Sequence, residues 1–397
     1  MAHLAFWAPL LNKEKSAPFP LVILDVLLIV YSCCHNKEVL TCSILDSTEW
    51  TKTLSKEWEE LFLNSFSVTP FQSFEWVSTW WNWFGGSKKP HIFEVREGKD
   101  LIGLMPMYET SFPVRILRPV GKGHSDYLQP LIRKGYEHSF CERFSDYLHT
   151  LKKIDLIDLQ QIRENHPLLN YFSSCQIIHQ DACYLLDLPS HFEDYLKGLS
   201  KSMRYEARRI NRPPFTTRQA QIRTVVDPEE IEKAFHIFFQ LHVKRWRQRA
   251  LPGSFARPMT QKFHMDYAKK ACAKGELKFS ILEYDGKPVG ALYVMKAGCS
   301  YFFYQSGFDP HFKTLSPGNV LVSHTIQLAI SEGATQFDFM RGLEPYKSRW
   351  KPQKAMKNFR ILKHSDHLKG KVSAFLGASA TKSRFKNTLK SVQLSPS

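Results

Sequence analysis

Hydrophobic and polar positions follow the same order of elements in two stretches of the chain. In each stretch, apolar residues spaced as on one helix face come first, and shorter apolar runs typical of strands follow. The first stretch predicts helices at about 54–64 and 72–84, strands at 91–96, 101–108 and 114–120, a helix at about 138–152 and a strand at 154–160. This order predicts a mixed α/β unit.

The second stretch repeats that order in the later part of the chain. It predicts helices at about 228–248 and 259–274, strands at 277–284, 289–296 and 301–307, a helix at about 318–332 and a strand at 335–340. In both stretches a tight turn of acidic-Gly-Lys type, at 97–100 and 285–288, joins two strands. We therefore predict a duplicated α/β unit.

The remaining residues divide the chain into four parts. We expect a leader at 1–38, an N-terminal domain at 39–184, a C-terminal domain at 185–365 and a basic tail at 366–397. An apolar run lies within the leader, but Asp25 interrupts it and it is shorter than the roughly 20 residues of a membrane helix. A dispensable leader, or a start assigned too early, is favoured over a signal peptide.

A basic segment connects the two predicted units. Its pattern predicts a helix at 192–212, which Pro213 and Pro214 end. A solvated face, a phosphate clamp and an RNA-binding edge are all compatible with its cations, Lys201, Arg204, Arg208, Arg209 and Arg212. Tyr205 is the one aromatic residue among them, which disfavours nucleic acid as the partner.

The composition narrows the class of partner. Lys and Arg number 54 against 38 Asp and Glu, so the net charge of +16 favours a nucleotide cofactor, RNA or an acidic membrane surface. The 8 cysteines form no Cys-x-x-Cys pair, which argues against a disulfide scaffold and a structural zinc site. We expect a cytoplasmic protein without a metal, peripheral at the inner membrane where its basic tail contacts the surface.

The segment 301–350 holds the densest candidate chemistry. A Pro- and Gly-containing loop at 313–319 opens a predicted helix, and the free N–H groups of a first helical turn bind phosphate. Lys313 supplies a counter-charge. Further along, Asp338 lies between two phenylalanines on a predicted buried strand and needs a partner, for which Arg341 is close in sequence.

Two other features have competing interpretations. Trp76, Trp80, Trp81 and Trp83 lie on one predicted helix, where core packing is favoured over a platform for sugar stacking. The Gly-rich loop at 121–127 is compatible with a turn satisfied by its own side chains. The same loop is also compatible with acceptor binding, in which His124 or Asp126 would be catalytic.

Several spaced motifs together resemble a known family. The motifs at 304–310, 316–318 and 337–350, with further matches at 71–76, 123–127, 199–204 and 242–246, are similar to those of CelD-like acetyltransferases of the GNAT superfamily, often tied to cellulose or other exopolysaccharide synthesis. The resemblance covers about 70–365. It implies two GNAT-like domains in tandem, as in FemAB transferases, with mixed sheets flanked by helices. One departure is that the usual GNAT phosphate loop, Gln/Arg-x-x-Gly-x-Gly/Ala, is absent at 314–319.

The resemblance also implies roles for individual residues. A carboxylate takes the proton of the acceptor amine, for which Glu344 is the first candidate and Asp338 the second, and Tyr304 or Tyr346 protonates the leaving thiolate. The donor, acetyl-CoA or another acyl-CoA, is expected at Ser306, Lys313, Ser316, Gly318, Asn319 and Val320. The acceptor is expected at Gln305, Arg341, Lys347, His242, Arg245 and Trp246.

The sequence therefore predicts an acyltransferase that uses acyl-CoA. The expected acceptor is an amine or hydroxyl of a sugar, or of a cell-envelope or exopolysaccharide precursor. Two alternatives stay open. One is a FemAB-like transferase that depends on aminoacyl-tRNA, and the other is a non-catalytic factor for polysaccharide assembly.

Overall fold

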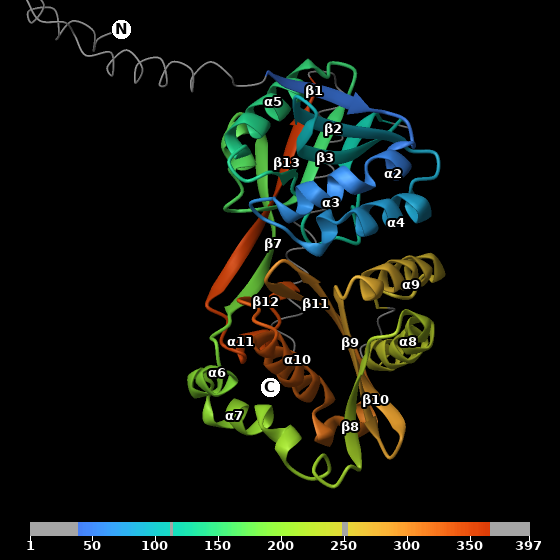
Figure 1. The fold of residues 1–397 in the computed structure, drawn as a ribbon, viewed down its shortest axis with the longest axis vertical. Coiled ribbons are helices and arrows are strands. Elements are labelled where there is room, and N and C mark those ends of the chain that lie inside the picture. The colour runs from blue at the N-terminus through green and yellow to red at the C-terminus, as the bar shows by residue number, and fades with distance from the viewer. Residues whose placement is uncertain (1–38, 112–113, 248–252, 366–397) are drawn as a thin grey trace, which may run out of the picture.

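The computed structural model describes residues 39–111, 114–247 and 253–365. The predicted leader at 1–38 and basic tail at 366–397 lie outside the described residues. A single mixed sheet runs through both halves of the described chain, with helices on its faces (Figure 1). Its strands are β1 (Leu40–Leu45), β2 (Lys89–Glu97), β3 (Asp100–Thr110), β4 (Ile116–Pro119), β5 (Leu131–Ile132), β6 (Leu156–Arg163), β7 (Gln176–Asp187), β8 (Ala220–Val225), β9 (Leu277–Tyr284), β10 (Lys287–Ala297), β11 (Ser300–Phe308), β12 (Gln336–Arg341) and β13 (Lys354–His364).

The longer helices fall close to where the sequence pattern places them. They are α2 (Trp50–Thr53), α3 (Ser55–Leu63), α4 (Phe74–Phe84), α5 (Glu137–Thr150), α6 (Phe192–Gly198), α7 (Lys201–Ala207), α8 (Ile231–Arg247), α9 (Pro258–Ala273), α10 (Pro317–Ser331) and α11 (Pro345–Ser348), with short 3-10 turns such as η4 (Arg209–Asn211) and η6 (Pro310–Leu315). The predicted α/β class, a mixed sheet flanked by helices, is confirmed.

The long strands β7 and β13 join the two halves. The sheet order is β1-β2-β3-β4-β6-β13-β7-β12-β11-β10-β9-β8, and β5 pairs with β3. The last strand, β13, therefore lies between β6 and β7, and β7 in turn pairs with β12. Figure 1 shows both strands crossing from one half to the other. This exchange places the end of the second predicted unit inside the sheet of the first.

The structure corrects the prediction of one helix at 192–212. That segment forms α6, α7 and η4 instead. The chain is extended at Leu199 and Ser200, and the Ser200 hydroxyl accepts a hydrogen bond from the N–H of Met203, which starts α7 as an N-cap. Strands β1, β5, β7, β8 and β13 were also absent from the prediction.

The tryptophans of α4 pack in the core, as the favoured interpretation predicts. Trp76 has no exposed surface, and Trp80 and Trp81 are also buried. The Trp76 ring lies edge-on to Phe263 and Tyr267 of α9, at centroid distances of 4.9 and 4.8 Å. The two halves therefore share one sheet and are also joined by direct contact between their helices α4 and α9.

A second contact between the halves is a pair of salt bridges. Lys274, after α9, has its Nζ 2.6 Å from Glu75 on α4 and 3.0 Å from Glu59 on α3. Nearby, burial and then the charge of Glu75 raise the pKa of Glu276 from its ordinary 4.5 to about 7. Because the ionised form is disfavoured in the folded protein, the free energy of unfolding should fall as pH rises through this range.

The Glu276→Gln variant should lose this pH dependence. We expect its melting temperature to match that of the wild type at pH 5 and to exceed it at pH 8, because only the wild type then carries the buried charge. Thermal unfolding at pH 5, 6, 7 and 8 measures this. Glu142→Gln, which changes an exposed carboxylate of α5, is the control and should leave the difference between pH 5 and pH 8 unchanged. Equal pH profiles of wild type and Glu276→Gln would contradict the assignment.

Candidate active site

A groove of about 680 Å³ lies at the N-terminus of α10. In Figure 1, α6 and α7 lie beside α10, and residues of α7 form one wall of the groove. The lining residues are Lys201, Ser202, Tyr205, Glu206, Ser316, Asn319 and Arg349. A groove of this volume is in the size range of sites for small molecules and cofactors.

The start of α10 is shaped by three consecutive residues. Ser316 adopts a left-handed conformation, with φ 51°, and Pro317 occupies the first helical position. A Cβ atom placed on Gly318 would meet nothing within 4 Å, so the helix opens toward free space. The predicted phosphate-binding loop therefore leads into a helix whose first turn is accessible.

A carboxylate that the sequence analysis did not select lies at this helix end. Glu206 of α7 forms an ion pair with Arg209, at 2.8 Å. Burial acts to raise the pKa of Glu206, but the hydrogen bond from Arg209 and the polar side chains of Ser316 and Asn319 hold it below its ordinary value. The only signal in the sequence was a single Glu within a run of cations, and nothing local indicates that it meets α10.

Strands β11 and β12 diverge beside the groove helix. They pair in parallel only from Ser300 to Phe302 and from Gln336 to Asp338. Beyond that point the register of β12 against β7 shifts, and Met340 has a left-handed backbone with φ 61°. The Asp338 carboxylate accepts the N–H of Met340 at 2.7 Å, which holds the irregular backbone.

Three predicted site residues bind the Gly-rich loop of the other half, residues 121–127. The Tyr304 hydroxyl donates to the carbonyl oxygen of His124 at 2.8 Å. Arg341 donates to Asp126 from its side chain, at 2.5 Å, and from its backbone N–H, at 3.1 Å. The Tyr127 hydroxyl donates to Asp338 at 2.6 Å. The loop thus connects the halves at the divergence of β11 and β12.

The predicted pairing of Asp338 with Arg341 is wrong. Asp338 has no exposed surface, and its charge partner is Arg163 of β6, at 3.2 Å. Burial raises the pKa of Asp338, opposed by Arg163 and by the Tyr127 hydroxyl. The two residues bind different partners because the backbone changes direction between them, at Met340. In this conformation Asp338 is fully buried and forms a contact between the halves through Arg163 and Tyr127.

Glu344 is the accessible carboxylate of the predicted catalytic set. Its side chain is 47% exposed, and it lies 2.8 Å from Lys347. Lys347 is buried and donates to the carbonyl oxygens of Arg341 and Gly342, at 2.8 and 3.1 Å. These contacts give Lys347 the role of holding the loop after β12, where the sequence predicted acceptor binding. Tyr346 packs partly buried on the core of this half.

Burial also raises the pKa of Tyr304. A tyrosine with a raised pKa is a weaker acid, so the environment does not favour Tyr304 as the proton donor to a leaving group. The roles of Glu344 and Tyr346 stay predictions.

The predicted acceptor residues on α8 pack against β11. His242 has no exposed surface, and burial together with Arg245 lowers its pKa to about 4. Arg245 donates to the hydroxyl and the carbonyl oxygen of Ser306, at 2.8 and 3.1 Å, and Trp246 contacts the His242 ring. Of the residues expected to bind the donor, Ser316 and Asn319 line the groove, while Val320 is buried beneath it. Lys313, in η6, and Gln305, on β11, are not among the lining residues.

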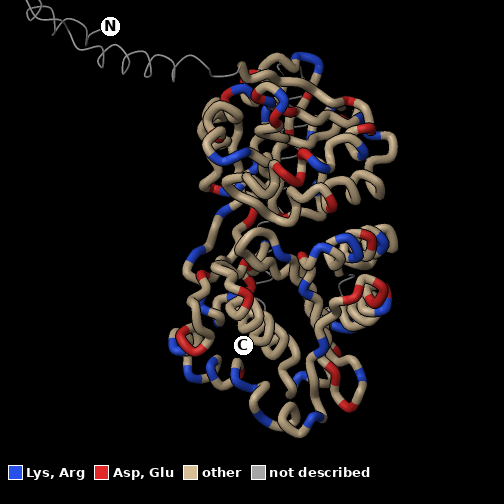
Figure 2. Tube along the Cα trace, in the orientation of Figure 1, with Lys and Arg blue, Asp and Glu red and all other residues tan. Residues whose placement is uncertain are grey.

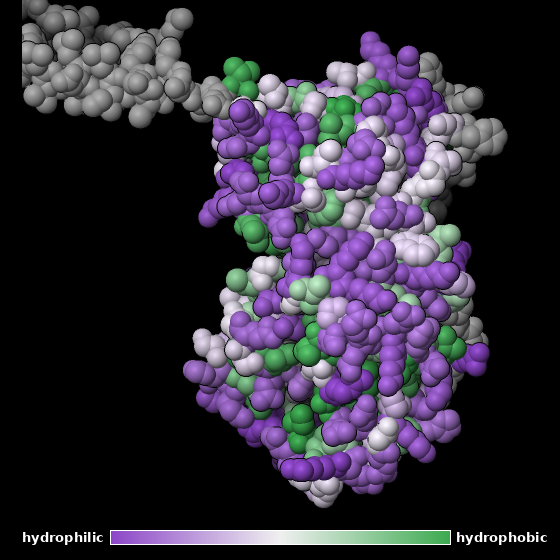
Figure 3. All heavy atoms as spheres, turned by 45° about the vertical axis from the view of Figure 1, so that its right-hand side comes forward, coloured by the Kyte–Doolittle hydropathy of each residue, from purple (hydrophilic) through white to green (hydrophobic). Residues whose placement is uncertain are grey.

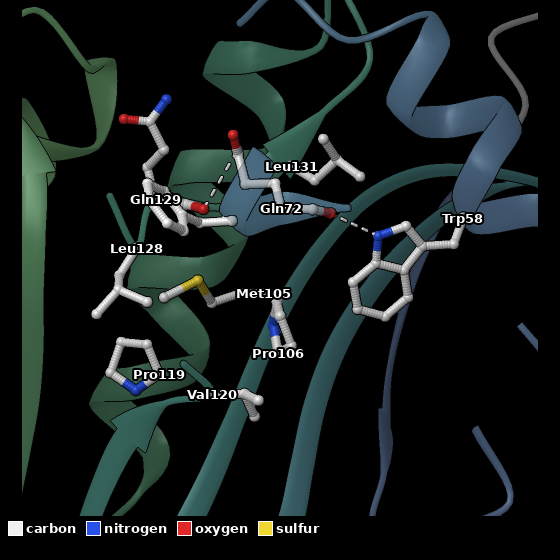
Figure 4. A pocket seen from close by; sticks show the side chains of 10 residues that line it. Trp58, Gln72, Met105, Pro106, Pro119, Val120, Leu128, Gln129 and Leu131 are labelled. Carbon is white, nitrogen blue, oxygen red and sulfur yellow. Dashed lines mark hydrogen bonds between the residues drawn. The ribbon is translucent and has the colours of Figure 1, made fainter. Parts of the chain in front are cut away.

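A second cavity, in the N-terminal half, is too small for a substrate. Its volume is about 10 Å³, and Figure 4 shows that mostly apolar side chains surround it, including Met105, Val120 and Leu131. The indole N–H of Trp58 donates to the carbonyl oxygen of Gln72 at 2.8 Å, which fixes one of its walls. This cavity is part of the packed core.

The surface adds two observations. Figure 2 shows Lys and Arg gathered along α7, η4 and the segment toward β8. Figure 3 shows a mainly hydrophilic face in which hydrophobic residues form scattered groups. Within the described residues, no group of three or more His, Cys, Asp and Glu side chains is arranged to hold a metal. None of the helices described is both long and apolar enough to cross a membrane.

Comparisons with known proteins define the class of one part of the chain. Residues 201–348, which include the groove and the diverging strands, match the family described as acetyltransferase (GNAT) domain. This match lies within the second half of the chain. No curated protein matches the chain.

Solved structures extend the likeness of fold to both halves. The crystal structure of FemX is similar with a TM-score of 0.58 and 9% identity, over 81% of this chain and 97% of that chain. L-PGS from Bacillus licheniformis gives 0.51 and 15%, over 82% and 96%. The C-terminal domain of a putative lysylphosphatidylglycerol synthetase from Agrobacterium fabrum gives 0.52 and 10%, also over 82% and 96%. At these identities the likeness shows the fold alone.

Proposed function

We propose that this protein is an acyltransferase that moves an acyl group from acyl-CoA to an amine or hydroxyl of a sugar or of a cell-envelope or exopolysaccharide precursor. The observation that carries the proposal is the groove at the accessible N-terminus of α10, next to the divergence of β11 and β12. The free N–H groups of a helical first turn and the positive end of the helix dipole favour phosphate groups. Lys201 and Arg349 add cations to the same groove.

The reaction requires few groups from the protein. The neutral acceptor amine attacks the thioester carbonyl, a carbon–nitrogen bond forms and the carbon–sulfur bond breaks, and the leaving thiolate takes a proton from the proposed donor Tyr346. Glu344 is the proposed base that takes the proton from the amine nitrogen, because it is the half-exposed carboxylate at the end of β12. Backbone N–H groups at the divergence of the strands stabilise the developing oxyanion.

Transfer from an aminoacyl-tRNA is the second candidate. The observation that favours it is the Glu206 carboxylate beside the N-terminus of α10. A diphosphate would otherwise bind there. The cations gathered along α7 and η4 suit a polyanion (Figure 2). For this candidate we expect binding of tRNA that weakens steeply with salt, without saturable binding of CoA.

The Asn319→Asp variant tests the site of the donor. We expect the Kd for acetyl-CoA, measured by titration calorimetry, to rise about tenfold, because a new carboxylate at the first turn of α10 repels the diphosphate. Asn170→Asp, the same change at an exposed position of the N-terminal half, is the matched control and should leave Kd unchanged. Equal affinities for Asn319→Asp and wild type would reject this donor site.

A parallel titration separates the two candidates. Saturable binding of acetyl-CoA by the wild type, with weak and non-specific binding of tRNA, supports the first. Binding of tRNA alone supports the second.

A further inference from the structure

We propose that Glu206 determines which donors the groove accepts, by competing with the donor's phosphate for the N-terminus of α10. The inference rests on the proposed function, in which that helix end receives a diphosphate. Glu206 lies among the residues that line the groove, together with Ser316 and Asn319 of the helix start. Ser316 and Asn319 are among the residues that the sequence analysis assigned to the donor, and one oxygen of the Glu206 carboxylate beside them is buried without a hydrogen-bond partner among the described residues.

Glu206 is held in place by a connection to the loop before α10. Its carboxylate is 2.8 Å from Arg209, and Arg209 also donates to the carbonyl oxygen of Thr314 at 2.9 Å. The Glu206 side chain is 17% exposed, so solvent screens its charge only in part. The carboxylate is therefore anchored at the helix end through Arg209, on the same side as the loop that leads into α10.

The helix end accommodates one anion better than two. A carboxylate at a helix N-terminus is favourable, and a phosphate at the same place is favourable for the same reason. When both are present, like charges a few ångströms apart repel, so a diphosphate must displace Glu206 or bind further out. The groove therefore disfavours a free diphosphate more strongly than a groove without this carboxylate would.

Two cations that line the groove, Lys201 and Arg349, are not paired with Glu206. Within the part of the chain that the structure describes, neither Lys201 nor Arg349 forms an ion pair, whereas Arg209 is paired with Glu206. Tyr205, which is 57% exposed, lines the same wall, and the Arg212 guanidinium lies 3.7 Å from the centre of its ring. The groove thus offers unpaired cations and an aromatic face away from the occupied helix end. A donor whose phosphate lies at those cations keeps Glu206 in place.

Titration calorimetry with ADP on the full-length protein tests the proposal. We expect Glu206→Gln to bind ADP about tenfold more tightly than the wild type, because the amide keeps the shape and removes the competing charge. Glu206→Asp keeps the charge and should bind ADP as weakly as the wild type. The matched control is Glu193→Gln on α6, whose carboxylate pairs with Arg208 outside the groove; it makes the same change in net charge and should leave the Kd for ADP unchanged.

Two results would overturn the inference. One is an unchanged or higher Kd for ADP in Glu206→Gln, provided that its circular dichroism matches that of the wild type. The other is an equal gain in Glu193→Gln, which would assign the effect to net charge. If Glu206→Gln does not fold, Glu206→Ala replaces it with the same expectation.

The test is independent of catalysis. Tighter ADP binding by Glu206→Gln, together with no acyl transfer from acetyl-CoA or aminoacyl-tRNA, would uphold the role of Glu206 and reject the proposed function. If the wild type transfers acyl groups but Glu206→Gln leaves the Kd for ADP unchanged, the proposed function is upheld and the role of Glu206 is rejected.

Discussion

The Asp338→Asn variant is expected to lose about 3–5 kcal/mol of unfolding free energy, because it leaves a buried guanidinium without its carboxylate. Asp338 has no exposed surface, and Arg163, which is also buried, is its charge partner at 3.2 Å. The asparagine side chain has nearly the same volume, so the loss does not come from a cavity. Urea denaturation followed by circular dichroism measures it.

The structure predicts that this loss weakens the contact between the halves. Tyr127 donates to Asp338, and the Arg163 guanidinium stacks over the Tyr127 ring at 3.8 Å from its centre. The control is Asp187→Asn on β7, an exposed carboxylate 3.4 Å from Lys354, which should cost less than about 1 kcal/mol. A loss for Asp338→Asn as small as that of the control would show that the buried pair contributes little.

For catalysis, the largest expected effect is that of Glu344→Gln. If Glu344 takes the proton of the acceptor amine, turnover should fall about 10²- to 10⁴-fold. The KM for the donor should stay the same, because Glu344 is not among the residues that line the groove. The measurement is release of CoA from acetyl-CoA with a panel of amino sugars such as glucosamine and galactosamine.

Stability separates this catalytic role from a structural one. Glu344 pairs with Lys347, which also donates to backbone carbonyl oxygens, so the loop after β12 keeps most of its contacts in the variant. Glu230→Gln, which removes another half-exposed carboxylate from a surface ion pair, is the control and should retain turnover. Unchanged turnover in Glu344→Gln would reject the base assignment.

The exchange of strands has a consequence for the candidate site. Because β13 lies between β6 and β7, and β7 pairs with β12, the loop at 121–127 is positioned against the diverging ends of β11 and β12. The N-terminal half therefore forms part of the environment of Tyr304 and Arg341. Isolated expression of residues 185–365 would remove these contacts.

Prediction from sequence succeeded where the signal is local. The spacing of apolar residues placed the helices and the hairpin strands of both units, and β9 has the bounds that the pattern predicted, 277–284. Ser316, Pro317 and Gly318 indicated an accessible helix start, because the conformations they favour depend on the residues themselves.

The strands that were missed are those whose pairing is non-local. In β13 and β7 exposed, half-buried and buried positions mix without strict alternation. Strand β13 pairs with β6 and β7, which come early in the sequence, and β7 pairs with β12 and β13, which come late in it. Alternation of apolar and polar residues is therefore a weak signal on these two strands. No pattern within β7 or β13 shows which strand will pair with it.

The sequence by itself determined the order of helices and strands, the duplicated α/β plan and the helix start that faces the groove, because periodicity and capping act within a few residues. Only the tertiary structure decided the partner of Asp338 and the place of Glu206. Both are charged groups whose nearest charges come from other elements: Arg163 is on β6, and the start of α10 is far from α7 in sequence. Electrostatic partners depend on distance in space, and distance in space follows from the crossing of β7 and β13 and the packing of α7 on α10.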